Sequence, residues 1–213
     1  MHQSSMRAMG EFVSTHLAAY AGRPLRILDI GSMNVNGTYR ELMNDPNWRY
    51  TGVDMASGPG VDVVLPSPYD WSPLPSASYD VVISGQAFEH IEYPWVTILE
   101  VNRVLKPGGI VCLIAPSGGY EHRFPVDCWR FYPDGMMALA RWGDLDVVSC
   151  LTNWSPQGTY DDDSAAWKDT VLVARKRGES GPRTVKTDLK KALLRRVNAF
   201  QATRRQSAVE AQD

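Results

Sequence analysis

The chain has 213 residues, of which 44% are hydrophobic and 22% are charged, as expected for one globular domain. A formal net charge of −2 gives no global excess of basic residues and argues against a nucleic-acid partner. No apolar run is long enough to span a membrane, and no signal-peptide pattern is visible at the N-terminus. The three cysteines form no disulfide framework and predict reduced thiols. We therefore expect a cytoplasmic protein that does not bind membranes.

The first half of the chain predicts alternating helices and strands. Apolar residues at helical spacing predict a helix over residues 6–20, which Gly22 and Pro24 end. Strands are predicted over 26–30, 50–54, 61–65 and 79–84, a short helix over 38–43, and a loop rich in Pro and Ser over 66–78.

The second half continues the alternation. It predicts a helix over 89–104 broken by Pro94, a turn over 106–109, a strand over 110–115, a helix over 134–142, and strands over 145–151 and 170–174. Strands that alternate with helices predict a mostly parallel sheet covered on both faces. The last two strands lack an obvious helix between them, so we expect a hairpin and one antiparallel strand near the edge of the sheet.

Polar residues and glycine follow the first two predicted strands. Gly31 comes directly after the first strand, and Asp54 ends the second. Ligands of open parallel sheets bind at the carboxyl ends of the strands, where glycine lets the backbone approach and a carboxylate can accept hydrogen bonds from ribose hydroxyls. The pattern predicts a nucleotide-type site, but it lacks the Gly-x-Gly-x-x-Gly of NAD-binding turns.

Five segments resemble motifs of the class I S-adenosylmethionine (SAM)-dependent methyltransferases, in the order and spacing of that family. They are residues 27–31, Asp54, residues 79–84, residues 88–91 and residues 105–109. The resemblance implies a Rossmann-like, doubly wound α/β fold with seven mostly parallel strands, and SAM as the cofactor.

The resemblance also implies a cofactor site, built from Asp29, Gly31, Ser32, Asp54, Met55, Asp70, Trp71 and Gln86. Gly31 and Ser32 would approach the methionine part of SAM, and Asp29 would organise that loop. Asp54 would bind the ribose. Asp70 would contact the adenine, and the alternative for Asp70 is a loop acid in water.

The segment 116–135 after the fifth predicted strand is long, aromatic and polar, which favours an acceptor site. His122 is a candidate base for a hydroxyl proton, and Asp127 could orient it or grip a hydroxyl. The alternative for Asp127 is an ion pair with Arg130 that holds the loop shut. His90 is the second candidate base.

Glu89 and His90 are also candidate metal ligands. Some members of the family bind Mg²⁺ through Glu-x-x-Glu-His at this place. Gln86 stands where the first Glu would fall, which removes one hard anionic ligand. Many members carry Glu-His with no metal, and we favour that interpretation while leaving Mg²⁺ open.

The domain boundary is expected near residue 177. Residues 1–177 would form the methyltransferase domain, with residues 1–22 as an N-terminal helix that can close over SAM and Tyr20 as its lid. Residues 178–213 would be a linker and a basic helix, whose apolar stripe predicts docking on the body or on a second copy as a homodimer. His2 is expected in the tail, and residues 161–163 in a solvated loop.

The pattern from His122 to Phe131 looks like one found in bacterial methyltransferases of polysaccharide and glycoside pathways, and the chain is similar in general appearance to the mycobacterial mannoside O-methyltransferases of methylmannose polysaccharide synthesis. We predict an O-methyltransferase for a hydroxyl of a sugar, oligosaccharide or related small polar acceptor. The alternatives are another acceptor (a phenol, an amine or a carboxylate), a non-catalytic SAM-binding module, and an NAD or nucleotide-sugar oxidoreductase.

Overall fold

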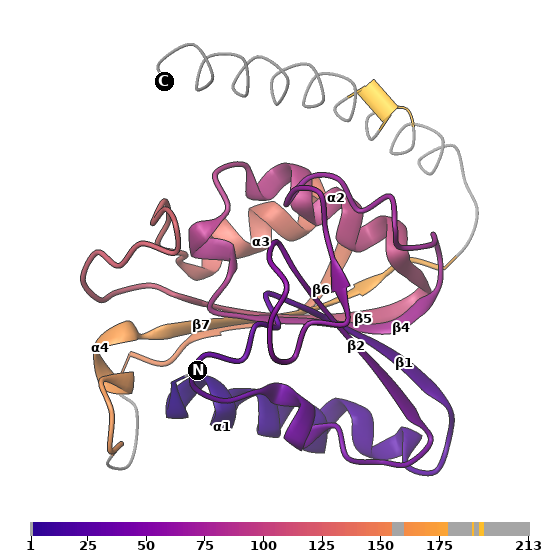
Figure 1. Cartoon of the computed structure of the whole chain (residues 1–213), viewed down its shortest axis with the longest axis horizontal. Helices are drawn as coiled ribbons and strands as arrows, with labels where there is room; N and C mark the ends of the chain where they lie inside the picture. Colours follow the sequence, from indigo (N-terminus) through magenta and orange to yellow (C-terminus); the bar gives the residue numbers. More distant parts are fainter. Residues whose placement is uncertain (1, 155–159, 179–188, 190–191, 194–213) are drawn as a thin grey trace. The chain divides into compact units, whose positions relative to one another are not determined.

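A twisted sheet forms the centre of the protein in the computed structural model (Figure 1). Among the described residues its strands are Leu25–Ile30 (β1), Trp48–Asp54 (β2), Val63–Val64 (β3), Tyr79–Gly85 (β4), Leu105–Pro116 (β5), Leu145–Thr152 (β6) and Asp169–Lys176 (β7). They lie in the order β3-β2-β1-β4-β5-β7-β6. Strand β7 is antiparallel to both of its neighbours, and the remaining pairs are parallel. This is a Rossmann-like, doubly wound α/β fold, so the predicted fold is confirmed, with the antiparallel strand second from the edge.

Helices cover both faces of the sheet. Helix α1 (Gln3–Phe12) continues through a π turn and a 3-10 turn to Tyr20, and it lies on one face. Helices α2 (Pro94–Val104) and α3 (Pro133–Trp142) lie on the other face (Figure 1). A short helix, α4 (Ser164–Trp167), precedes β7. The layers agree with the sheet covered on both sides that the sequence predicts.

Strand β1 shows how the sequence builds the two cores. Its apolar side chains alternate, so Ile27 packs in the α1 layer while Leu28 and Ile30 pack in the α2 and α3 layer. Asp29 shares the α1 side of the strand with Ile27. This places a carboxyl group inside the protein, directly before the turn that begins the candidate site.

Some predicted elements differ in length from the observed ones. Residues 38–43 form only a 3-10 turn, Tyr39–Leu42, since Pro46 and the residue before it disfavour a longer helix. The predicted strand over 61–65 shrinks to β3. Helix α2 begins at Pro94 rather than breaking there, because proline needs no N–H partner in the first helical turn. The predicted turn at 106–109 lies within β5, whose pairing with β4 is irregular at this point.

The structure describes residues 2–154, 160–178, 189 and 192–193. Residues 1–177 form one compact unit, and residues 178–213 are a separate one. Apart from three residues, the predicted basic helix lies outside the described residues. None of the described helices is long and apolar enough to cross a membrane.

Candidate active site

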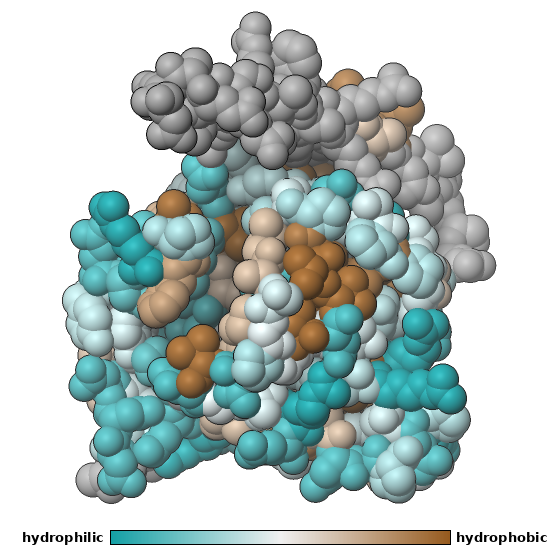
Figure 2. All heavy atoms as spheres, in the orientation of Figure 1, coloured by the Kyte–Doolittle hydropathy of each residue, from teal (hydrophilic) through white to brown (hydrophobic). Residues whose placement is uncertain are grey.

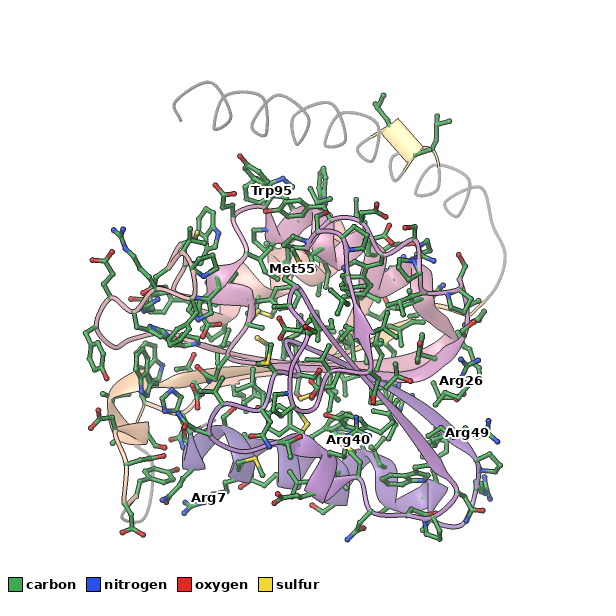
Figure 3. The ribbon with its side chains drawn as sticks, in the orientation of Figure 1. Arg7, Arg26, Arg40, Arg49, Met55 and Trp95 are labelled. Carbon is green, nitrogen blue, oxygen red and sulfur yellow. The ribbon has the colours of Figure 1, made fainter. Side chains whose placement is uncertain are left out.

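A cavity of about 720 Å³ lies at the carboxyl ends of β1, β2 and β4. Gly31, Asp54 and Gln86 follow or end these three strands and line it. Figure 2 shows hydrophobic residues gathered in the middle of the face that carries Met55, which is labelled in Figure 3 and also lines the cavity. Arg26 and Arg49 mark the opposite end of the sheet in Figure 3, where β1 and β2 begin. The cavity therefore lies where a doubly wound sheet binds its ligands.

Gly31 makes the sharp turn out of β1. Its φ of 75° is in the left-handed region, and its amide donates to the carbonyl of Val53 at 2.9 Å. A Cβ at this position would lie 2.6 Å from the Cβ of Ala87. A side chain is thus excluded both by the backbone conformation and by the close approach of the next loop.

Asp54 is fixed at the end of β2 by two backbone amides. Its Oδ2 accepts from Met33 N at 3.1 Å, and its Oδ1 accepts from Met55 N at 2.6 Å. A carboxylate offers about four acceptor positions, so these bonds leave others for a ligand in the cavity. Asp54 is half-buried, and this arrangement is suited to holding hydroxyl groups.

Asp29 and Ser32 lie behind the cavity wall instead of in it. Asp29 is 2% exposed and accepts a hydrogen bond from the Tyr50 hydroxyl. Burial raises the pKa of Asp29 to about 7, against the opposing effect of that hydrogen bond. The Ser32 hydroxyl donates to the carbonyl of Gly60 at 3.0 Å. Among the described residues, neither lines the cavity, and both shape the turn that does.

Trp71 and Gln86 line the cavity, whereas Asp70 is not among the described residues that do. The Trp71 indole is fully buried, and its N–H donates to Pro68 O at 3.1 Å, so the ring is held as a wall. Asp70 is exposed and accepts from Ser72 N at 2.9 Å. Gln86 donates from Nε2 to Asp169 at 2.8 Å, and its buried Oε1 has no hydrogen-bond partner within the described part of the chain.

The loop after β5 is fastened by Asp127. Its carboxylate, 2% exposed, forms a bidentate ion pair with Arg130 at 2.6 and 2.8 Å and accepts from His122 N at 2.8 Å. The Arg130 guanidinium holds the pKa of Asp127 well below its usual range. Arg130 also donates to Tyr120 O at 2.7 Å. The ion pair named as the alternative for Asp127 is therefore present.

The two candidate bases lie beside each other. The rings of His90 and His122 are 4.8 Å apart at an edge-to-face angle, and both line the cavity. His90 Nδ1 lies 2.6 Å from Val126 O, and since a carbonyl only accepts, this nitrogen carries the proton. Burial lowers the pKa of His90. Its Nε2 is thus a lone-pair site in the neutral ring. His122 packs edge-on against Trp167 at 4.5 Å, with Nδ1 3.5 Å from Asp127 Oδ2.

Glu89 lies close to both histidines. It is 0% exposed, and Oε1 lies 3.6 Å from His90 Nε2. Its backbone carbonyl accepts from the amides of Cys128 and Trp129, which joins the loop to the end of β4. Burial raises the pKa of Glu89 to about 8.

Several residues of the site escaped sequence reasoning. His2, expected in the tail, lines the cavity and packs against Trp167 at 4.9 Å, which corrects that expectation. Asp169 is buried and receives hydrogen bonds from Ser4 and Gln86. These residues meet because β7 runs antiparallel, so its first residue lies at the edge where the parallel strands end. The sequence signal was weak: a polar pair, Asp169-Thr170, that opens an apolar strand.

The predicted lid residue Tyr20 lies elsewhere. It packs against the apolar core on the α1 side of the sheet, and it is not among the described residues that line the cavity. The opposite end of the helical segment, at His2, reaches the cavity. Asp162 accepts from Gln3 N at 2.9 Å and from Ser164 N at 2.9 Å. Cys112, Cys128 and Cys150 are free thiols.

Known proteins resemble this chain in sequence and fold. Residues 28–113 match the family described as a methyltransferase domain. An uncharacterized methyltransferase of Mycobacterium leprae is 32% identical over 125 residues, covering 52% of this chain and 45% of the relative. One of Mycobacterium tuberculosis is 30% identical over 125 residues, covering 52% and 48%. The chain thus spans about half the length of the curated relatives it matches.

Solved structures share the fold at low sequence identity. The 1,6-didemethyltoxoflavin-N1-methyltransferase of Burkholderia thailandensis, solved with S-adenosylhomocysteine, is 17% identical with a TM-score of 0.59, covering 82% of this chain and 79% of that one. The [4+2]-cyclase SpnF is 17% identical with a TM-score of 0.62, covering 83% of each chain. Residues 28–113 therefore resemble a methyltransferase domain, and the fold around them is one shared with solved methyltransferases, among them one that binds S-adenosylhomocysteine.

Proposed function

We propose that this chain is a SAM-dependent O-methyltransferase that acts on a hydroxyl of a sugar, an oligosaccharide or a related small polar acceptor. One observation carries the proposal: a continuous cavity joins Gly31 and Asp54 to the imidazoles of His90 and His122. A volume of about 720 Å³ lies within the range of ligand sites and is large enough for a cofactor with a small acceptor beside it.

The Gly31–Asp54 end of the cavity fits the cofactor. Gly31 lets the backbone approach the methionine part, and Asp54 has acceptor positions left for the ribose hydroxyls. Met55 and the Trp71 ring offer apolar walls for the adenine. Asp29, Ser32 and Asp70 would act on this end from outside the cavity, by holding the surrounding loops.

The histidine end fits proton removal from the acceptor. The reaction forms a bond between the acceptor oxygen and the methyl carbon and breaks the bond between that carbon and the sulfonium sulfur, whose electron pair stays on sulfur. The hydroxyl proton must leave the oxygen, and a neutral imidazole is suited to accept it. His90 fits this role because its Nδ1 proton is bound to Val126 O and its Nε2 lone pair is free, and His122 is the second candidate.

The acceptor is proposed to be a carbohydrate because of the character of the loop over the cavity. Tyr120 and Phe124 line the cavity and are 59% and 66% exposed, so their rings can cover the apolar face of a sugar. The proposed catalytic unit is residues 1–177. Pairing of two copies through the C-terminal segment, and the likeness to mannoside O-methyltransferases, belong to the same proposal.

Calorimetric titration with S-adenosylhomocysteine tests the cofactor end. The wild-type protein should bind it and should not bind NAD, and Asp54→Ala should weaken binding at least tenfold, about the loss of one good hydrogen-bonding group. Asp146→Ala is the matched control, since Asp146 is an exposed acid on β6 that pairs with Arg177. Normal affinity in Asp54→Ala would show that the proposed position of the cofactor is wrong.

A screen of acceptors with SAM tests the other end. Sugars and oligosaccharides should be methylated, and phenols, amines and carboxylates should not. Turnover of one of those classes instead would overturn the carbohydrate acceptor. Tight cofactor binding without turnover of any class would favour a non-catalytic SAM-binding module.

A further inference from the structure

We propose that Glu89, His90 and His122 form a binding site for a divalent transition metal at the acceptor end of the cavity. One ligand atom of each residue lies within 4.8 Å of the other two. The two histidines line the cavity, while Glu89 is buried beside them. The sequence prediction paired only Glu89 with His90. The third residue, His122, comes from the loop after β5 and lies 32 positions beyond His90 in the sequence.

The distances fit a metal after a small adjustment. A central ion with bonds of about 2.1 Å separates tetrahedral ligand atoms by about 3.4 Å. Glu89 Oε1 and His90 Nε2 are 3.6 Å apart, which is already close to this value. The three ligand atoms lie within 4.8 Å of one another, so the longest separation exceeds the tetrahedral value by at most about 1.4 Å, a difference that side-chain rotation can close.

Glu89 provides the independent observation that points to a ligand. Both of its carboxylate oxygens are fully buried, and neither has a hydrogen-bond partner within the described part of the protein. An unpartnered buried polar group costs about 1–3 kcal/mol, more if it is charged. The Glu89 side chain faces the ring nitrogen of His90. A cation bound between them would satisfy the carboxylate.

His90 is held as a metal-binding histidine usually is, and His122 has a carboxylate close to its ring. His90 donates its Nδ1 proton to Val126 O at 2.6 Å, which directs the lone pair of Nε2 toward Glu89. The carboxylate of Asp127 lies 3.5 Å from His122 Nδ1, a buried nitrogen that also has no hydrogen-bond partner among the described residues. Carbonyl and carboxylate groups behind a histidine commonly fix its ring for coordination.

The donor set selects the class of metal. Two imidazole nitrogens and one carboxylate suit Zn²⁺, Fe²⁺, Co²⁺ or Mn²⁺, whereas Mg²⁺ prefers oxygen ligands. Mg²⁺, which the family resemblance left open, therefore does not fit these residues. Three protein ligands leave at least one coordination position open toward the cavity, as in catalytic rather than structural metal sites.

The consequence for the reaction rests on the proposed function. A divalent cation lowers the pKa of an oxygen ligand bound to it, so it would promote ionisation of an acceptor hydroxyl. With the ion bound, His90 and His122 would act as its ligands. They would act as bases only in the metal-free protein. Metal binding itself does not depend on the acceptor or on SAM.

Calorimetric titration of chelator-treated, full-length protein with Zn²⁺, Mn²⁺ and Mg²⁺ tests the site directly. We expect one bound ion per chain, with Zn²⁺ bound at least about 100-fold more tightly than Mg²⁺. Co²⁺ should give the visible absorption of a site with nitrogen ligands. Glu89→Gln and His122→Asn should each weaken Zn²⁺ binding by about 100-fold. His16→Asn is the matched control, because His16 packs against Phe12 on the α1 side and lies outside the cavity.

Binding of S-adenosylhomocysteine, measured on the same proteins, separates the possible failures. Glu89→Gln and His122→Asn should retain it, which shows that they are folded. If the wild-type protein binds S-adenosylhomocysteine but no metal, the inference is wrong and the proposed function stands. If it binds metal but not S-adenosylhomocysteine, the proposed function fails and the site remains. Equal loss of Zn²⁺ binding in His16→Asn, or equal affinity for Mg²⁺ and Zn²⁺, would also overturn the inference.

Discussion

The two ends of the cavity are built in different ways. The Gly31–Asp54 end is shaped mainly by the backbone. Strands end there, Gly31 has a left-handed conformation, and two backbone amides hold the Asp54 carboxylate. At the histidine end, side chains from distant segments are fastened to one another. Asp127 and Arg130 close the loop, which then docks on Glu89 and His90. Changes at the first end should therefore disturb the fold and cofactor binding together, whereas changes at the second should affect the acceptor and leave cofactor binding nearly unchanged.

The largest effect is expected from Gly31→Ala. The new Cβ would lie 2.6 Å from the Cβ of Ala87, at a φ of 75° that alanine rarely adopts. We expect a loss of about 3 kcal/mol in the free energy of unfolding, measured with urea, and loss of S-adenosylhomocysteine binding. Gly135→Ala on α3 is the control, since nothing lies within 4 Å of its Cβ, and it should leave stability unchanged or slightly raised. Equal stability of the two variants would contradict the role given to this turn.

The second effect concerns pH, for which Asp29 and Asp127 have opposite signs. The folded pKa of Asp29, about 7, is above its unfolded value, so the contribution of Asp29 to stability is lost as pH rises from about 4 to 7. Asp29→Asn keeps an acceptor for Tyr50 and cannot ionise. Its free energy of unfolding should gain on that of the wild type by up to about 3 kcal/mol between pH 5 and pH 8. Urea unfolding at both pH values measures this difference, and parallel pH profiles would contradict it.

Asp127 behaves in the opposite way. Its folded pKa is depressed, so its contribution is present above its unfolded pKa and is lost only in strong acid. Asp127→Asn should loosen the loop at neutral pH and lower kcat/KM for the acceptor by about 10- to 100-fold, since small misplacements near the reacting atoms have effects of this size. Affinity for S-adenosylhomocysteine should change less than about twofold. A parallel loss of cofactor affinity would show that the two ends are not separable.

The smallest effect is expected from Trp129→Phe. The Trp129 indole donates to Ile91 O at 3.0 Å and to Glu92 O at 3.2 Å, which ties the loop to the segment after β4. Removing this donor should cost about 1 kcal/mol of stability and raise the acceptor KM. Trp142→Phe removes a similar bond, to Trp95 O at 2.7 Å, and should leave that KM unchanged. Steady-state kinetics of the two variants make the comparison.

The same contrast explains how far the sequence could predict the site. Gly31 and Asp54 were found because a strand, a glycine and an acid recur at short range in a fixed order. His122 and Glu89 were named separately, but their meeting depends on how one loop returns to the end of β4. Contacts of that kind leave no periodic signal. His2, which lines the cavity, and Asp169, which holds Gln86 beside it, were missed for the same reason, since they are placed by contacts between the two ends of the domain, such as that of Ser4 with Asp169.

The reversed direction of β7 sets the size of the smallest working fragment. The family match ends at residue 113. A fragment cut there would retain Gly31, Asp54 and His90. It would lack Trp167 and Asp169, which lie at the start of β7. His2 would then lose its packing partner Trp167, and Ser4 would lose its hydrogen bond to Asp169. A recombinant protein meant to hold the whole cavity therefore has to run from the N-terminal helix through Lys176, and a tag joined before His2 would emerge from the cavity wall itself.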